Sequence, residues 1–483
     1  MKNKVKFGTS GIRGLVSDMS DKVCYAYTLS FLDYLKAIGA IAEGHKVGIS
    51  GDLRHSTPRI MNAVAAAVTD AGYQVVNCGL LPTPALTLYG ISLKIPTIMV
   101  TGSHIPDDRN GIKFNKPDGE VLKQDEQGIL AQDPQLNDAL FDGERLLQHD
   151  YLPVIDRAAE EQYITRYLDF FPENALSGLK CGVYQHSSVA RDILPTILSG
   201  LGADVVVLGR SDSFISVDTE AIRPEDVVLA KQWSEQYALD CIISTDGDAD
   251  RPLISDEHGE WLRGDVAGIL VARFLQIDAL VTPVSSNSAV EKCASFSRVV
   301  RTRIGSPYVI SAMQAIIDMP KVAGYEANGG FLLNTPVSLK GKQLSALPTR
   351  DAVIVPLCIL LAAKQGNCTL AQLLKTLPER YTYSDRIKDF PSELSHSILR
   401  GIQTGEFNHD AAEFARLFAG QLDQAVSFDC TDGVRVTLAN DELVHIRGSG
   451  NAPELRCYTE ASSYQRAKAL NALCIQHMGN WKE

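Results

Sequence analysis

Short apolar runs alternate with helix-like stretches along the first 300 residues of the chain. The runs at 46–50 and 73–77 flank a stretch at 58–72 with helical spacing, and the same strand–helix–strand order returns at 180–208 and at 278–302. Units of this kind with short connections predict parallel strand pairs. The pattern therefore predicts three related α/β domains.

The last hundred residues follow a different pattern. Residues 428–438 predict a hairpin with a tight turn at Asp432-Gly433. Further strands are expected at 443–447 and 455–460, and a helix at 462–479. These elements predict an α+β domain with a mostly antiparallel sheet.

The polar stretch 378–385 lies between the two patterns and is expected to be a linker. The predicted fold class is thus α/β, with three related βαβ-containing α/β domains and a C-terminal α+β domain. The expected domain boundaries are 1–150, 151–256, 257–378 and 379–483.

Composition limits the partners and the location. A net charge of −12 argues against a nucleic-acid or anionic-membrane partner, although local arginines can still hold a small anion. Ten cysteines without a C-x-x-C spacing predict free thiols in a reducing cytosol. The N-terminus lacks the apolar stretch of a secretory signal, and the apolar run 352–363 predicts a buried helix that is too short to span a bilayer. A cytoplasmic protein without an obligate protein partner is expected.

Two loops that follow predicted strands carry candidate chemistry. Thr-Gly-Ser-His-Ile-Pro at 101–106 places the Ser103 hydroxyl just past the strand 95–100, at the end of a strand where open α/β sheets bind ligands. Asp-Gly-Asp-Ala-Asp-Arg at 246–251 spaces three carboxylates two residues apart. Such carboxylates repel one another without a cation, and oxygen ligands suit Mg²⁺ or Ca²⁺. The second loop therefore predicts a metal site.

Two alternative interpretations of the acidic loop fit less well. In an EF-hand counted from Asp246, position 12 is Glu257 as required, but position 6 is Arg251 and not glycine, and the flanks predict strands. A phosphatase with a nucleophilic aspartate after a strand shares the apolar strand and the paired aspartates. That pattern, however, expects a threonine where Asp250 stands.

Two later loops carry candidate binding groups. Residues 324–330 contain Glu326 and Asn328, which can accept from and donate to neighbouring sugar hydroxyls. Residues 447–456 place Arg447 and Arg456 on either side of a Ser-Gly-Asn turn, whose N–H groups can form a nest for an anion. Arginine guanidinium groups that can donate two hydrogen bonds each, together with such a nest, suit the binding of a phosphate group.

In this order along the chain, the four loops resemble those of the α-D-phosphohexomutase family. The family has a Thr-small-Ser-His-x-Pro phosphoserine loop, an Asp-Gly-Asp-x-Asp-Arg metal loop, a Gly-Glu-type sugar loop and an Arg-x-Ser-Gly-x-x-Pro phosphate loop. Phe-Gly-Thr-Ser-Gly-Ile-Arg-Gly at 7–14 and Gly-Asp-Leu-Arg at 51–54 also match, so that the resemblance covers 7–460. It implies four domains around a central cleft and the reversible transfer of phosphate between the 1- and 6-positions of a hexose.

The resemblance implies a role for each loop. Ser103 would carry the phosphate. Mg²⁺ would be held by a phosphate oxygen on Ser103 and by Asp246, Asp248 and Asp250. A hexose 1,6-bisphosphate would be the reorienting intermediate and the activator. Glu326 and Asn328 would hold the sugar hydroxyls. The phosphate that is not reacting would be held by Arg447, Ser449, Gly450, Asn451 and Arg456.

Four further residues are candidates near the serine and metal loops. Lys113 is a candidate proton-transfer group near Ser103, and Arg13 and His104 are candidates to support the phosphoserine. Arg251 is expected to brace the metal loop or to contact phosphate.

Three departures from the family pattern bear on the substrate. Gly102 replaces the commoner alanine and is expected to loosen its loop. The sugar loop ends in Gly329-Gly330 where many members have Gly-His, and the phosphate loop has Asn451-Ala452 where many have Thr-Glu. The Ser-Gly-Asn-Ala-Pro-Glu form looks most like phosphomannomutases of polysaccharide pathways. It favours mannose phosphate as the substrate, with glucose phosphate as a second one.

Other functions are compatible with the same loops. Phosphoglucosamine mutase is the alternative within the family. A sugar-phosphate-binding protein without turnover and a phosphohydrolase come from other classes. The serine and all three metal-loop aspartates are present, so nothing in the sequence favours a loss of turnover.

Overall fold

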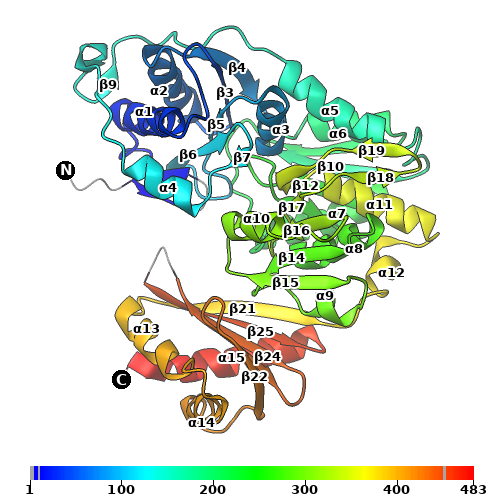
Figure 1. The fold of residues 1–483 in the computed structure, drawn as a ribbon. Helices are drawn as coiled ribbons and strands as arrows, with labels where there is room; N and C mark the ends of the chain where they lie inside the picture. Colours follow the sequence, from blue (N-terminus) through cyan, green and yellow to red (C-terminus); the bar gives the residue numbers. More distant parts are fainter. Residues whose placement is uncertain (1–4, 9–10, 450–452, 483) are drawn as a thin grey trace. The chain divides into compact units, whose positions relative to one another are not determined.

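The structure is a computed structural model that describes residues 5–8, 11–449 and 453–482. Contacts within it divide the chain into two compact units. The larger unit comprises Met1–Leu280 and Gly305–Leu374, and the smaller comprises Val281–Ile304 and Lys375–Glu483. Figure 1 follows the chain through its elements.

The first sheet has seven strands in the order β1-β2-β6-β5-β3-β4, with β7 paired to β6. Its strands are β1 (Lys6–Phe7), β2 (Gly11–Leu15), β3 (Lys46–Gly51), β4 (Gln74–Leu80), β5 (Thr97–Val100), β6 (Arg109–Lys116) and β7 (Gly119–Glu120). As predicted, β3 pairs in parallel with β4, and it also pairs in parallel with β5. Figure 1 shows α1 (Asp21–Ala37) and α2 (Thr57–Asp70) on one side of the sheet and α3 (Thr83–Leu93) on the other.

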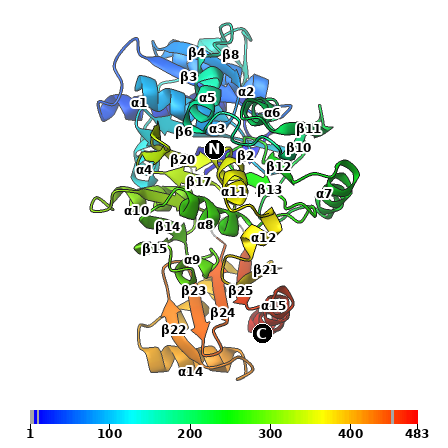
Figure 2. The ribbon, with the colours of Figure 1, turned by 90° about the vertical axis from the view of Figure 1, so that its right-hand side faces the viewer.

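The second sheet has four strands in the order β11-β10-β12-β13. These are β10 (Lys180–His186), β11 (Asp204–Arg210), β12 (Cys241–Thr245) and β13 (Pro252–Ile254). The central strand β10 pairs in parallel with β11, as predicted, and it also pairs in parallel with β12. The helices of this region are α5 (Ala158–Phe170), α6 (Ile193–Gly200) and α7 (Pro224–Tyr237), and α7 packs beside β12 (Figure 2).

The third sheet has five strands in the order β15-β14-β16-β17-β20. These are β14 (Ala279–Pro283), β15 (Arg298–Thr302), β16 (Val322–Tyr325), β17 (Phe331–Leu333) and β20 (Leu347–Asp351). The predicted helix at 289–295 is shorter, α9 (Ala289–Lys292). The apolar run at 352–363 forms the buried helix α11 (Ile354–Gln365), as predicted. Helices α8 (Gly264–Phe274) and α10 (Ser306–Gln314) complete the region.

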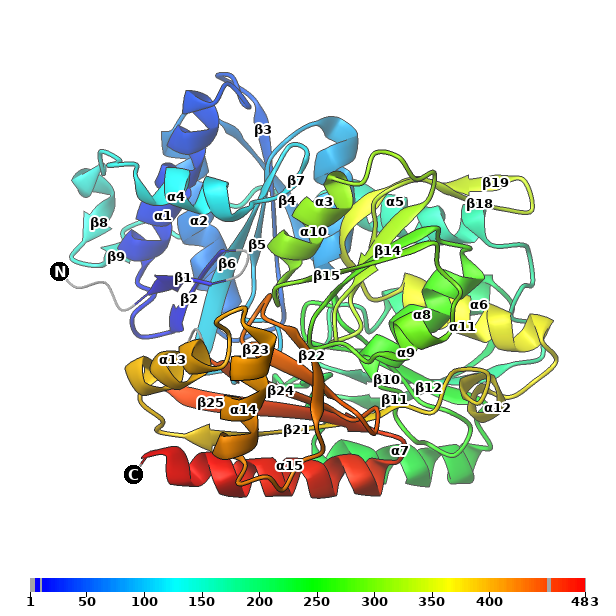
Figure 3. The ribbon, with the colours of Figure 1, turned by 60° about the horizontal axis from the view of Figure 1, so that its bottom comes forward.

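The fourth sheet is antiparallel throughout, in the order β21-β25-β24-β23-β22. Its strands are β21 (Tyr381–Lys388), β22 (Ala425–Asp429), β23 (Val434–Leu438), β24 (Leu443–Gly448) and β25 (Glu454–Ala461). Helices α13 (Ser392–Gly401), α14 (Phe407–Leu417) and α15 (Tyr464–Gly479) share one apolar core with it. Figure 3 shows α15 running along β21 and β25.

Short elements fill the connections. They are α4 (Lys123–Leu130), α12 (Leu370–Leu374) and the strand pairs β8 (Phe141–Asp142) with β9 (Arg145–Leu146) and β18 (Val337–Leu339) with β19 (Lys342–Leu344). No helix in the described part of the chain is long and apolar enough to cross a membrane. All ten cysteines are free, in agreement with their spacing.

The expected linker at 378–385 is wrong. Residues 381–388 form β21, which pairs with β25 along its whole length, from Tyr381 opposite Ala461 to Lys388 opposite Glu454. The strand lies at the edge of its sheet and is mostly exposed. An exposed edge strand needs no apolar alternation, so its polar composition concealed it.

His445 lies buried on β24, beside the turn at Asp432. Its ring stacks on Tyr458 with 5.3 Å between the ring centroids, and its Nε2 donates to the Asp432 carbonyl oxygen at 2.6 Å. Burial lowers the pKa of His445 from 6.5 to about 4, although the bond to Asp432 acts in the opposite direction. The folded chain therefore holds this ring neutral above about pH 4.

This lowered pKa predicts a loss of stability in acid. The unfolded chain protonates His445 near pH 6.5 and the folded chain only near pH 4, so stability falls as the pH drops through that window. We expect this group to remove about 1.5 kcal/mol of unfolding free energy between pH 6.5 and 5, and His445→Gln to remove that part of the slope. Urea unfolding at the two pH values measures it. The exposed control His409→Gln should keep the wild-type slope, and an equal slope in His445→Gln would contradict the assignment.

Candidate active site

Three of the four predicted loops lie together in the larger unit, each at the end of a strand. The serine loop, residues 101–106, follows β5, and the metal loop, residues 246–251, connects β12 to β13. The sugar loop, residues 326–330, connects β16 to β17. Because β5, β12 and β16 belong to three different sheets, no local pattern could show that their ends meet.

Ser103 is buried and has a φ of 56°, in the left-handed region that non-glycine residues rarely adopt. Its backbone N–H donates to the Thr101 hydroxyl at 2.8 Å, and its own hydroxyl donates to Asp246 Oδ2 at 2.6 Å. Such backbone strain persists only where the surroundings hold the residue in place. The serine loop thus presents a fixed hydroxyl directly to the metal loop.

Arg54 is the scaffold that holds the serine loop. Its guanidinium is fully buried and donates to three backbone carbonyls of that loop and to the carbonyl of Arg109 just beyond it, at 2.6–3.1 Å, and to Asp52 Oδ2 at 3.0 Å. The ring of Phe214 covers it, with the guanidinium carbon 4.0 Å from the ring centroid. Asp52 in turn accepts from the Thr101 hydroxyl at 2.7 Å. A single buried cation therefore organises the whole loop.

Gly102 does not loosen this loop, and the structure corrects that expectation. A Cβ on Gly102 would lie 2.6 Å from Cζ of Arg54 and 2.7 Å from its Nε. Heavy atoms cannot approach so closely, so glycine is what allows the guanidinium to lie against the loop. Gly102 thus lets the Arg54 guanidinium pack directly against the loop.

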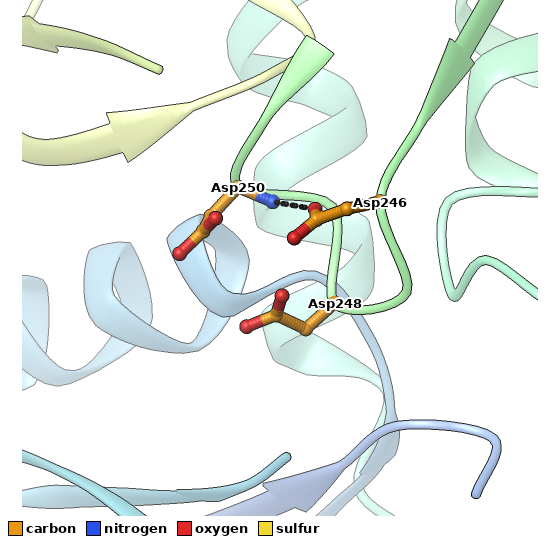
Figure 4. A group of neighbouring side chains, drawn as sticks. All are labelled: Asp246, Asp248 and Asp250. Carbon is orange, nitrogen blue, oxygen red and sulfur yellow. Dashed lines mark hydrogen bonds between the residues drawn. The ribbon is translucent and has the colours of Figure 1, made fainter. Parts of the chain in front are cut away.

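The metal loop brings three buried carboxylates together. One oxygen from each of Asp246, Asp248 and Asp250 lies within 4.8 Å of the others, and Figure 4 shows the side chains converging from one tight loop. Asp246 Oδ1 accepts from the backbone N–H groups of Asp250 and Arg251, at 3.2 Å each. Thr83 donates to Asp248 Oδ2 at 2.6 Å. The loop is thus closed on itself and fastened to α3.

The donor set fits a hard divalent cation such as Mg²⁺. Within the described residues, Asp248 Oδ1 and Asp250 Oδ1 are buried and have no hydrogen-bond partner. Buried carboxylate oxygens without partners are costly, and a cation among them would remove that cost. Burial and the negative charges of Asp248 and Asp250 also raise the pKa of Asp246 well above its usual range. This shift, too, results from carboxylates that are buried close together.

Lys113, on β6, supplies a positive charge at this cluster. Its ammonium donates to Asp248 Oδ2 at 2.5 Å and to Asp250 Oδ2 at 2.6 Å. Burial opposes the charge on Lys113, but the two carboxylates outweigh burial and raise its pKa. The pKa of Asp248 is lowered, because Lys113 outweighs the opposing effect of burial. Both groups are therefore charged at neutral pH, and the Oδ1 atoms stay free for a cation.

The other sequence candidates lie beside Ser103. His104 Nδ1 is 3.3 Å from the Ser103 hydroxyl, and burial followed by the charges of Arg251 and Arg13 lowers its pKa to about 2, so the ring is neutral. Arg251 Nε lies 3.7 Å from Asp250 Oδ1. A pocket of about 60 Å³ opens here, lined by Gly8, Gly11, Ile12, Arg13, Thr101, Ser103, Lys113, Arg251 and Arg350.

The sugar loop is held by a bond within its own turn and by two side chains from outside it. Asn328 Oδ1 accepts from the Gly330 N–H at 2.9 Å, and the Asn328 carbonyl accepts from the Thr219 hydroxyl at 2.8 Å. Glu326 Oε2 accepts from Arg350 Nη1 at 3.0 Å. Sequence reasoning missed Arg350, which lies 24 residues after Glu326 on β20. The available signal was an Arg-Asp pair at the end of an otherwise uncharged strand.

The fourth loop belongs to the smaller unit. Arg447 and Arg456 are paired opposite each other on β24 and β25, and the Ser449 N–H donates to the Glu454 carbonyl at 2.9 Å. Arg456 Nη2 donates to Glu454 Oε2 at 3.2 Å. The candidates Gly450 and Asn451 lie outside the described residues.

The contact between Gly102 and Arg54 predicts the effect of a methyl group. Gly102→Ala should lower the unfolding free energy by about 1–3 kcal/mol, because the added Cβ must displace a buried guanidinium. Urea unfolding measures the change. Gly401→Ala is the control, since a Cβ there meets no described atom within 4 Å and should cost nothing. Equal stability of the two variants would show that Arg54 can move aside.

Four models of one protein family match consecutive parts of the chain. Phosphoglucomutase/phosphomannomutase alpha/beta/alpha domains I, II and III match residues 4–135, 161–259 and 263–381, and the C-terminal domain matches 404–475. Among solved structures, a phosphoglucomutase/phosphomannomutase family protein from Burkholderia thailandensis has a TM-score of 0.75 at 19% identity, with 99% of this chain and 97% of that chain covered. The fold class expected from the sequence is confirmed.

Curated relatives extend the likeness over nearly the whole chain. A phosphomannomutase of Salmonella muenchen is 44% identical over 96% of this chain and 94% of its own length. A phosphomannomutase of Sinorhizobium fredii is also 44% identical, over 97% of each chain. A phosphoglucosamine mutase of Agrobacterium fabrum is 29% identical over 96% of each. With its four domain matches and these relatives, the chain belongs to the phosphoglucomutase/phosphomannomutase family, the phosphohexomutases that its loops resemble.

Proposed function

We propose that the protein is a phosphomannomutase, an isomerase that moves phosphate reversibly between the 1- and 6-positions of mannose phosphate, with glucose phosphate as a second substrate. The observation that carries the chemistry is the hydrogen bond from the strained, buried Ser103 to Asp246 of the three-carboxylate cluster. The 44% identity to two phosphomannomutases, against 29% to a phosphoglucosamine mutase, supports mannose as the sugar.

Ser103 is proposed to carry a phosphate that it gives to the free hydroxyl of the sugar monophosphate. The bond between phosphorus and Ser103 Oγ breaks as a bond to the sugar oxygen forms, and the proton of the sugar hydroxyl is passed to the departing Ser103 Oγ, which becomes a free hydroxyl again. The resulting hexose 1,6-bisphosphate turns over in the site, and its other phosphate returns to Ser103. Mg²⁺ held by Asp246, Asp248 and Asp250 would offset the charge that develops on the phosphoryl group.

The neighbouring side chains suit this transfer. Lys113 is a charged donor in the present arrangement and can stabilise phosphoryl oxygens, whereas His104 is a neutral ring 3.3 Å from the serine hydroxyl. Arg13 and Arg251 line the same pocket and add positive charge to it. Fixed charges of this kind do not have to rearrange during the reaction. This preorganisation is the main source of electrostatic catalysis.

The sugar and its second phosphate are proposed to bind the remaining loops. Glu326 and Asn328 would hold hydroxyls that the two orientations of the sugar share. Arg447, Ser449 and Arg456, with Gly450 and Asn451, would hold the phosphate that is not reacting.

Turnover tests the proposal directly. The protein is incubated with the 1-phosphates of mannose, glucose and glucosamine, with Mg²⁺ and a trace of hexose 1,6-bisphosphate, and the products and intact protein mass are followed. We expect mannose 6-phosphate to form fastest and one phosphate to be found on the protein. Ser103→Ala should lose the phosphate and at least about 10³-fold of the rate, because it removes the nucleophile.

The matched control is Ser295→Ala, an exposed serine whose loss should leave the rate unchanged. Faster turnover of glucosamine 1-phosphate would identify the alternative mutase, and release of inorganic phosphate would identify a hydrolase. Binding of the sugar phosphate without formation of any product would identify a sugar-phosphate-binding protein without turnover. A Ser103→Ala variant that still gains phosphate would show that another residue is the nucleophile.

The metal site has its own prediction. Asp248→Asn should weaken Mg²⁺ binding by at least about tenfold, because one charged oxygen ligand is lost from a three-carboxylate set. Calorimetric titration of metal-free protein with Mg²⁺ measures the dissociation constant. The control Asp118→Asn removes an exposed carboxylate that lies 3.7 Å from the Lys116 ammonium, and it should leave binding unchanged. Unaltered Mg²⁺ binding in Asp248→Asn would place the cation elsewhere.

A further inference from the structure

One guanidinium joins the metal loop to the sugar loop. Arg350 lies at the end of β20 with its side chain only 7% exposed. Its Nε and Nη2 lie 3.0 Å and 2.8 Å from Asp250 Oδ2, and its Nη1 donates to Glu326 Oε2 at 3.0 Å. The two carboxylates come from different sheets, so Arg350 forms a direct electrostatic bridge between them.

The sugar loop is shaped to admit this side chain. A Cβ on Gly330 would lie 2.6 Å from both Cγ and Cδ of Arg350, closer than side chains can approach. Gly330 and Arg350 therefore form a matched pair, in which the stem of the arginine fills the space beside the glycine.

The backbone of Arg350 is anchored on both sides. The preceding Thr349 donates to the buried carboxylate of Glu120 at 2.5 Å. The following Asp351 accepts from Tyr163 at 2.7 Å and also from Tyr167, both on α5. Since β20 is held by these contacts, the guanidinium has little freedom to follow either loop alone.

The bridge determines which carboxylate oxygens stay available. Asp250 Oδ2 is taken by Arg350 and by Lys113, whereas Asp250 Oδ1 is buried and without a hydrogen-bond partner in the described structure. Arg350 likewise holds Oε2 of Glu326. The guanidinium reaches Asp250 through Nε and Nη2 on one edge and Glu326 through Nη1 on another, and the single ammonium of a lysine at position 350 could not reproduce this arrangement.

We propose that Arg350 is a positioning residue that couples the cation site at Asp250 to the sugar-binding carboxylate of Glu326. Its role in turnover rests on the proposed mutase function, whereas the coupling itself does not. A substitution at Glu326 redistributes the hydrogen bonds of Arg350 and thereby changes the cation affinity of the site at Asp250. By thermodynamic reciprocity, a cation bound at Asp250 changes the strength of the interaction between Arg350 and Glu326.

A double-mutant cycle on Mg²⁺ affinity tests the coupling without substrate. Calorimetry gives the Mg²⁺ dissociation constant of the wild type, Glu326→Gln, Arg350→Lys and the double variant. In the wild-type background we expect Glu326→Gln to raise the dissociation constant by about threefold, because Arg350 then shifts wholly onto Asp250. In the Arg350→Lys background the same substitution should have little effect. A through-space effect of Glu326 would persist in both backgrounds.

Two further variants guard against a purely structural effect. Gly330→Ala keeps every charge but pushes on the stem of Arg350, and it should reduce the effect of Glu326→Gln as Arg350→Lys does. Arg210→Lys alters an exposed arginine that holds Asp192 at 2.6 Å and 3.1 Å, and it should leave the coupling intact. If Arg350→Lys does not fold, the same double-mutant cycle is measured with Gly330→Ala in its place, and the result decides whether the coupling exists.

Kinetics with mannose 1-phosphate complete the test. Arg350→Lys should raise KM by about tenfold and raise the Mg²⁺ concentration needed for half-maximal rate, whereas a merely structural role would lower stability without changing either. The inference would be overturned if Glu326→Gln had no effect on Mg²⁺ binding, or if its effect were equal in both backgrounds. If the coupling is found but the wild type converts no hexose phosphate, the proposed function fails and the coupling stands.

Discussion

The compensation of buried negative charge is the constraint on which the larger unit depends. Three aspartates at the end of β12 and Glu326 at the end of β16 lie buried within a few residues of strand termini. Buried carboxylates are tolerated only when cations or several donors surround them. Here Lys113 and Arg350 supply the positive charge, and they come from two further strands, β6 and β20. The site therefore exists only where four strands from three sheets meet.

Two glycines show how closely the arginines are packed into this arrangement. Gly102 makes room for Arg54 under the serine loop, and Gly330 makes room for Arg350 beside the sugar loop. Each arginine satisfies several acceptors from segments that are far apart in the chain. A planar guanidinium can do this with little loss of entropy for each bond that it makes. The departures from the family pattern at 102 and 330 are thus parts of the scaffold that holds the reactive groups.

The same packing suits the proposed phosphoryl transfer through Ser103. Ser103 is held in a strained conformation against Asp246, and the surrounding charges are fixed before a substrate arrives. Electrostatic catalysis depends on such preorganisation, because charges that are already in place need not reorganise as the reaction proceeds. The proposed sugar loop is stiffened by Asn328, whose Oδ1 accepts a hydrogen bond within its own turn.

The sequence by itself determined the fold class and most strands and helices, and it predicted four loops with candidate reactive side chains. It could do so because apolar periodicity and short motifs are local, and the aspartate spacing at 246–250 predicts a cation site without knowledge of the fold. Tertiary structure alone decided the edge strand β21, whose partner lies some 70 residues away along the chain and whose polar side chains carry no alternation. It also decided the roles of Arg54, Gly102, Arg350 and Gly330, because a buried guanidinium is defined by the carboxylates and carbonyls that other strands bring to it.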